Sequence, residues 1–109
     1  MLLISRRKGE GLVFDRLIVL RVTSVEAERV GLVISNRESK ELTALFETHA
    51  VTSAKGAKLY IGRGIAFQVI KIEEDRVFLG IDTPPGVSVD RVEIYLKIYP
   101  GDLDGLLST

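Results

Sequence analysis

The sequence feature that most constrains this chain is an internal repeat with a fixed offset of 47 residues. Residues 9–35 can be placed on residues 56–82 without a gap, and ten of these 27 positions are identical. Self-similarity at a constant spacing indicates a duplicated structural unit. Two half-size copies can share a hydrophobic core that neither copy would close alone.

The length of 109 residues is typical of one domain. We therefore expect a single domain over residues 1–109, built from a first repeat at 1–47 and a second repeat at 48–100, with a loose tail at 101–109. Hydrophobic residues make up 46% of the chain and charged residues 28%, which is typical of a globular fold and argues against disorder.

The absence of cysteine excludes disulfides, thiolate zinc sites and a cysteine nucleophile, and it is compatible with the reducing cytoplasm. The basic residues that begin at Arg6 leave no room for the apolar region of a signal peptide, and no apolar run reaches membrane-spanning length. We expect a cytoplasmic protein without a membrane segment, cofactor, metal site or catalytic constellation. Fifteen basic and fifteen acidic residues balance, so a nucleic-acid footprint has to be a local patch.

The hydrophobic pattern predicts mainly β-strands. Segments such as 65–72 (IAFQVIKI) are rich in β-branched and aromatic residues that partly alternate with polar ones, and short polar turns separate them. Each copy alone would leave open sheet edges, which an exchange of strands between copies would close. The expected strands are 2–7, 11–15, 16–25, 29–36, 59–62, 64–72, 76–82 and 86–90.

A helix is expected near the C-terminus. Asp90 provides an N-cap oxygen and Glu93 follows at capping-box spacing, so the helix would run through about Tyr99 and end at Pro100 and Gly101. Two alternatives stay open for residues 40–50, because the repeat offset predicts a strand there whereas the apolar residues have helical spacing.

The two copies differ at three arginines. The 47-residue offset sets Arg6 and Arg7 against Ser53 and Ala54, and it sets Arg91 against Ala44. Each copy therefore lacks the arginine that the other keeps, and the three arginines can meet in one site opposite a site that lacks them. Two arginine pairs occur in both copies and are interpreted as structural positions at strand ends or in surface ion pairs: Arg16 with Arg63, and Arg29 with Arg76.

The segments MLLISRRKGEGL at the start and GIDTPPGVSVDRVEIYLKI near the end resemble the carbon storage regulator family (CsrA/RsmA), whose members are bacterial post-transcriptional regulators. Family members have about half this length and form homodimers with exchanged strands. Each of their two RNA sites combines the first strand of one subunit with the last strand of the other. The resemblance implies an all-β fold with a short C-terminal helix, in which two interleaved repeats form a strand-exchanged pseudo-dimer with the shape of a sandwich or barrel.

The resemblance also implies the site. Its RNA-binding residues fall on Ile4, Ser5, Arg6 and Arg7 of the first strand and on Val87, Ser88, Val89 and Arg91 of the last, and Lys8 adds attraction for phosphates. The implied target is a GGA motif in the hairpin loop of an mRNA leader or small RNA. Because the copies differ at the three arginines, we expect one intact site and one degenerate site per chain. Asp90 and Val92 depart from the family pattern, in which many members have His and Glu.

The sequence also leaves two other kinds of partner possible. The same fold could act as a protein-interaction module that binds a FliW-like antagonist or another regulator through the face that lacks arginines. Two chains could also exchange strands into a homodimer, instead of each remaining a pseudo-dimeric monomer. An enzyme is a remote alternative, since the sequence has no nucleophile and base at a recognisable spacing.

Overall fold

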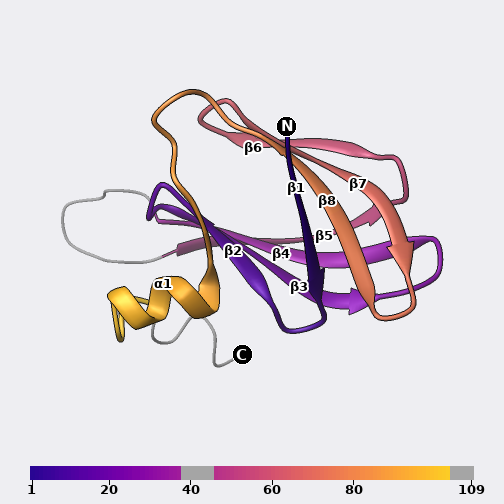
Figure 1. Cartoon of the computed structure of the whole chain (residues 1–109), viewed down its shortest axis with the longest axis horizontal. Helices are drawn as coiled ribbons and strands as arrows, with labels where there is room; N and C mark the ends of the chain where they lie inside the picture. Colours follow the sequence, from indigo (N-terminus) through magenta and orange to yellow (C-terminus); the bar gives the residue numbers. More distant parts are fainter. Residues whose placement is uncertain (38–45, 104–109) are drawn as a thin grey trace.

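The computed structural model describes residues 1–37 and 46–103, and within them the chain forms two antiparallel sheets and one short helix (Figure 1). One sheet has the strand order β1-β8-β7-β6 and the other has the order β5-β4-β3-β2-β9. The expectation of an all-β fold with a short C-terminal helix is confirmed. The bounds of the elements are β1 Leu2–Arg7, β2 Gly11–Phe14, β3 Ile18–Val25, β4 Arg29–Arg37, β5 Phe46–Ala54, β6 Lys58–Gly62, β7 Ile65–Glu73, β8 Arg76–Asp82, β9 Val89–Arg91 and α1 Val92–Ile98.

The first strand of each half pairs with the last long strand of the other half. β1 pairs with β8 so that Arg7 lies opposite Arg76, and β5 pairs with β4 so that Ala54 lies opposite Arg29. These registers are related by the 47-residue offset of the sequence. The β3–β4 and β7–β8 pairs also have register shifts at matching positions, beginning at Val22 and Val69. The exchange gives β4 and β8 a partner on both sides.

The core lies between the two sheets, where side chains alternate inward along each strand. On the outer face of the five-stranded sheet, a second cluster joins Val13 and Val19 to Tyr95 of α1 and to Leu103. The helix therefore covers this sheet from outside, next to β2 (Figure 1). The buried residues between the sheets are Leu12, Phe14, Ile18, Leu20, Val22, Val30, Leu32, Ile65, Phe67, Val69, Val77, Leu79 and Ile81.

The turn between β2 and β3 delays the strand that the sequence predicts from residue 16. Asp15 and Arg16 both have positive φ, at 53° and 60°, and the N–H of Leu17 donates to the carbonyl of Phe14 at 2.9 Å. Two positive φ values are typical of the tight turns that match the twist of a hairpin. Arg16 therefore lies in a turn, and its guanidinium stacks 4.0 Å from the centroid of the Tyr99 ring.

The predicted capping box at the start of the helix is wrong. Asp90 belongs to β9 and lies opposite Val13, while Arg91 is the N-cap, with an extended backbone and no side-chain cap. The carboxylate of Glu93 is bound by Arg6 instead. Val87 and Ser88 precede β9, so the last strand begins later than the expected residue 86.

The expectation of a loose tail from residue 101 fails for its first residues. The Tyr95 hydroxyl donates to the carboxylate of Asp102, and Arg37 pairs with the same carboxylate at 3.2 Å. The hydrogen bond from Tyr95 and the charge of Arg37 lower the pKa of Asp102 below its ordinary value. Leu103 is buried beside Tyr95, so the chain is packed at least to that residue. The rest of the expected tail, 104–109, lies outside the described residues.

The segment 40–50 is only partly described. β5 begins at Phe46, so residues 46–50 form a strand, as the repeat offset predicts. The remainder of that open alternative, residues 40–45, lies outside the described residues.

Candidate nucleic-acid interface

The three arginines singled out by the repeat line one hollow of about 300 Å³. Arg6 and Arg7 come from β1, and Arg91 comes from the end of β9. The hollow thus joins the first strand of the chain to its last strand, in agreement with the expected combination. Its lining residues are Ser5, Arg6, Arg7, Glu10, Arg76 and Arg91.

Strand pairing adds a fourth arginine to this hollow. The β1–β8 register sets Arg7 directly opposite Arg76. Like charges at opposed positions of a sheet destabilise it unless other groups compensate. Asp75 lies 3.6 Å from Arg7, but both side chains are largely exposed, so this ion pair contributes little. The hollow therefore keeps a positive potential, which suits an anionic ligand.

Arg6 occupies a different position from the other arginines. Its side chain is only 6% exposed, and its Nη1 donates to both carboxylate oxygens of Glu93, at 2.9 and 3.2 Å. The same guanidinium also donates to the backbone carbonyls of Ser5 and Gly11. The hydrogen bond from Arg6 lowers the pKa of Glu93 below its ordinary value. Arg6 therefore forms the floor of the hollow and positions the start of α1 next to Arg91, and its contact with RNA stays a prediction.

The last-strand residues divide between anchors and exposed groups. Val87 and Val89 pack against the core between the sheets, and Val89 lies opposite Phe14. Ser88 is exposed, and its carbonyl accepts a hydrogen bond from the N–H of Asp15 at 2.9 Å. Arg91 is exposed at the end of this anchored segment. The valines thus fix the backbone that presents Arg91.

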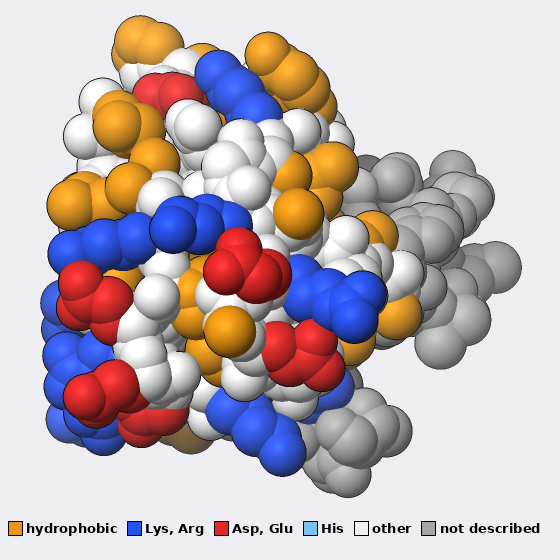
Figure 2. Space-filling model, turned by 90° about the vertical axis from the view of Figure 1, so that its right-hand side faces the viewer, with side chains coloured by type: hydrophobic (Ala, Val, Ile, Leu, Met, Phe, Trp, Pro, Cys, Tyr) orange, Lys and Arg blue, Asp and Glu red, His pale blue; other side chains and the backbone are white. Residues whose placement is uncertain are grey.

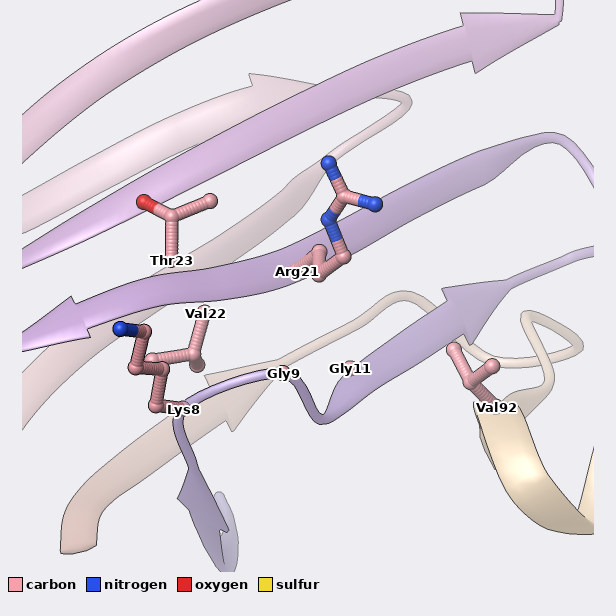
Figure 3. A pocket seen from close by; sticks show the side chains of 7 residues that line it. All are labelled: Lys8, Gly9, Gly11, Arg21, Val22, Thr23 and Val92. Atoms are coloured by element: carbon pink, nitrogen blue, oxygen red, sulfur yellow. The ribbon is translucent and has the colours of Figure 1, made fainter. Parts of the chain in front are cut away.

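The remaining predicted residues lie close to this arginine-lined hollow. Ile4 packs against the core, and Ser5 lines the arginine hollow. Lys8 is exposed in the β1–β2 turn and lines a second hollow, of about 380 Å³, together with Arg21 and Thr23 of β3 (Figure 3). All the predicted site residues therefore lie on β1, on β9 or directly beside them.

Residues 51–99 match the family model of CsrA, described as the global regulator protein family. This part of the chain is therefore similar to the CsrA family. Translational regulator CsrA of Bacillus subtilis (strain 168) is 48% identical over 40 residues, which are 37% of this chain and 54% of that protein. The CsrA of Alkaliphilus oremlandii (strain OhILAs) is 42% identical over 40 residues, with the same coverage of both chains.

The translational regulator CsrA of Exiguobacterium sp. (strain ATCC BAA-1283 / AT1b) is 36% identical over 44 residues, which are 40% of this chain and 59% of that protein. The chain thus spans a little more than half the length of the CsrA relatives that it matches. No solved structure matches it. Within the part of the chain that the structure describes, no helix is long and apolar enough to cross a membrane.

The 47-residue offset relates the corner that holds the arginine hollow to a second corner, which has other side chains. Ser53 replaces Arg6 there and is 2% exposed, and its hydroxyl has no hydrogen-bond partner among the described residues. Ala54 replaces Arg7 opposite Arg29, whose guanidinium pairs with Glu26 at 2.9 Å. The counterpart of Arg91, Ala44, lies outside the described residues. The second corner therefore lacks at least two of the arginines of the first.

Two residues of the arginine hollow were missed in the sequence. Arg76 was interpreted as structural because Arg29 occupies the same position in the first repeat, and only the β1–β8 pairing brings it next to Arg7. Glu10 accepts a hydrogen bond from the N–H of Arg7 at 2.8 Å and so fixes the β1–β2 turn. The offset gave a signal for Glu10, because the second copy has Ala57 at that position.

Charge is mixed on the end of the molecule to which the β7–β8 turn belongs. Figure 2 shows acidic and basic side chains interleaved over the end of the molecule that lies at the right in Figure 1. Another hollow, of about 500 Å³, is lined by three carboxylates of the β7–β8 turn as well as by Arg7 and Arg76. The arginine hollow is thus a local basic site on a chain without net charge.

Proposed function

We propose that this protein is a non-catalytic, RNA-binding post-transcriptional regulator that binds a GGA motif in a hairpin loop of an mRNA leader or small RNA. The observation that carries the proposal is the hollow lined by Arg7, Arg76 and Arg91 above the buried Arg6. The similarity to CsrA over part of the chain supports it, since these curated relatives are named translational regulators.

The chemistry of the hollow fits single-stranded RNA. Unpaired loop bases expose their edges, and arginine binds guanine O6 and N7, or a phosphate, with two parallel hydrogen bonds. β1 and β9 are the edge strands of their sheets within the described residues. Edge strands have backbone N–H and C=O groups without a strand partner, which can bind bases alongside the arginines. Charge and backbone groups therefore meet at one place.

We further propose one working RNA site per chain. A bidentate arginine contact contributes about 1–3 kcal/mol to discrimination. The corner with Ser53 and Ala54 lacks the counterparts of Arg6 and Arg7. We expect specific binding to be lost there, although the backbone pairing is the same.

Titration of a GGA hairpin against the full chain, followed by native mass spectrometry, tests both statements. A hairpin with a scrambled loop serves as the control at the same salt concentration, since phosphate contacts make affinities salt-dependent. We expect one GGA RNA per chain. Equal affinity for the two hairpins would contradict the function, and two equivalent sites per chain would contradict the assignment of one site.

A further inference from the structure

We propose that the hollow lined by Lys8, Arg21 and Thr23 binds backbone phosphates of the same RNA, so that the strand leaves the arginine hollow on this side. The inference rests on the proposed function and adds a subsite and a direction to it. Arg21 and Thr23 were not among the residues expected to bind RNA.

The residues of this hollow suit a phosphate rather than a base. Arg21 and Thr23 alternate along β3 with the buried Leu20 and Val22, so they face outward. Figure 3 shows Lys8 and Thr23 on one side of the hollow, with Arg21 and Val92 towards the other. Among the described residues, its charged and polar side chains are those of Lys8, Arg21 and Thr23. Groups of this kind bind phosphate oxygens with little reading of sequence.

Glycine allows β2 to lie close to β3 at the wall of the hollow. A Cβ at Gly11 would lie 2.4 Å from the carbonyl oxygen of Leu20 and 3.2 Å from Cγ2 of Val92. Only glycine fits such a close approach of β2 to β3 and to the start of α1. The wall of the hollow therefore carries no side chain at Gly9 and Gly11.

The two hollows are adjacent because consecutive residues line them. Arg7 lines the arginine hollow and Lys8 the second one. Likewise, Glu10 and Arg91 line the arginine hollow, and the residues that follow them, Gly11 and Val92, line the second one. The β1–β2 turn and the start of α1 are thus a shared wall, and an RNA strand that leaves one hollow across this wall enters the other.

The opposite exit is unfavourable for RNA. The hollow that shares Arg7 and Arg76 with the arginine hollow is also lined by Glu73, Glu74 and Asp75. Carboxylates repel phosphates over a Debye length of about 8 Å at physiological salt. The electrostatic difference between the two sides therefore sets the direction of the strand.

The test uses two RNAs with the same GGA loop sequence, one a short single strand and the other extended by flanking nucleotides on both sides. We expect Arg21→Gln and Lys8→Gln each to weaken binding of the extended RNA about three- to tenfold and to leave the short RNA unchanged. Each change should also reduce the slope of log affinity against log salt by about 0.7 on the extended RNA. Arg63→Gln is the matched control, since it removes one exposed charge from the β6–β7 turn.

The outcomes separate the two proposals. Equal losses on both RNAs, or no loss beyond that of Arg63→Gln, would overturn the phosphate subsite while GGA binding stood. If the wild-type protein failed to distinguish GGA from a scrambled loop, the proposed function would fail, and the salt slope of the extended RNA would still decide the subsite. Lys8 lies in an exposed turn, so its variant gives a reading even if Arg21→Gln impairs folding.

Discussion

The two corners of the molecule related by the 47-residue offset share a backbone and differ in side chains. Arg6 and Arg7 lie opposite Val77 and Arg76 in one corner, and Ser53 and Ala54 lie opposite Val30 and Arg29 in the other, in the same register. Even the turn hydrogen bonds match, since Gly9 and Gly56 each donate to a carbonyl at 2.7 Å. The comparison teaches that the pairing of strands is maintained separately from the chemistry of the site, because backbone hydrogen bonds do not depend on the side chains that face the hollow.

The largest effect is expected from a substitution that introduces an arginine into the second corner. Ser53→Arg places a charge at a position that is 2% exposed, without the carboxylate that Glu93 supplies to Arg6. An unpaired buried charge costs about 3–5 kcal/mol, so we expect a loss of this order in the free energy of unfolding, measured by urea denaturation. Ser53→Ala is the control and should be neutral or slightly stabilising, because the serine hydroxyl has no partner among the described residues.

A stable Ser53→Arg variant that also bound a second RNA would mean that the corners differ in side chains alone. The expected instability would mean that the second corner has lost the surroundings of its arginine as well as the arginine.

In the first corner, a substitution can remove the contacts of the buried Arg6. Arg6→Ala removes a buried guanidinium and its hydrogen bonds to Glu93, and it leaves a cavity beneath Arg91. We expect a loss of about 2–3 kcal/mol in the free energy of unfolding, below the full cost of a broken buried pair because Glu93 is half exposed. Thermal unfolding measures this loss of stability. A stability equal to that of the wild type would contradict a structural role for the Arg6–Glu93 pair.

Arg91→Ala should separate binding from stability in the same corner. The side chain is exposed, so we expect the free energy of unfolding to change by less than about 0.5 kcal/mol. Binding of a GGA hairpin should weaken by about 1–3 kcal/mol, measured by calorimetry. Arg63→Ala in the β6–β7 turn is the control and should leave binding unchanged. An equal loss from both variants would place the site elsewhere.

The smallest expected effect concerns pH. The Arg6 hydrogen bond lowers the folded-state pKa of Glu93 below the ordinary 4.5, so the pair stabilises the fold above that pH. This stabilisation is lost as the pH falls through the lowered pKa, because Glu93 is then protonated. Glu93→Gln should therefore make stability less dependent on pH below about 4.5. The lowered pKa of Asp102 acts in the same direction in both proteins and leaves a shared residual slope. Identical pH profiles would contradict the Arg6–Glu93 pair.

Local patterns in the sequence predicted the strands well. Alternation of apolar residues placed eight strands that each overlap an observed one, and Pro100 with Gly101 placed the end of the helix within two residues of Ile98. The helix start was wrong because the capping box assumes that Glu93 turns back onto its own helix. Its carboxylate instead pairs with Arg6, which is 87 positions away.

The sequence predicted that arginines from both ends of the chain lie together, but it did not predict their different surroundings. The 47-residue offset and the family motifs brought together residues at both ends of the chain, and Arg7 and Arg91 do line one hollow. Burial of Arg6 and the inclusion of Arg76 depend on how β1 is laid against β8 and α1, which no local pattern encodes. Leu103 was placed in a tail that we expected to be loose, with docking of this leucine left open, because its partner Val13 is distant in sequence.

The sequence by itself determined which segments are strands, that two similar halves are present and that their arginines differ, because hydrophobic period and residue identity are local properties of the chain. Only the tertiary structure decided which arginines are open to a ligand, since this depends on long-range pairing. Exchange of β1 and β5 between the halves sets Arg7 against Arg76 and brings Glu93 to Arg6. The same packing leaves Ser53 buried without a hydrogen-bond partner among the described residues. Burial and ion pairing arise from neighbours in space, and these neighbours exist only once the two sheets have formed.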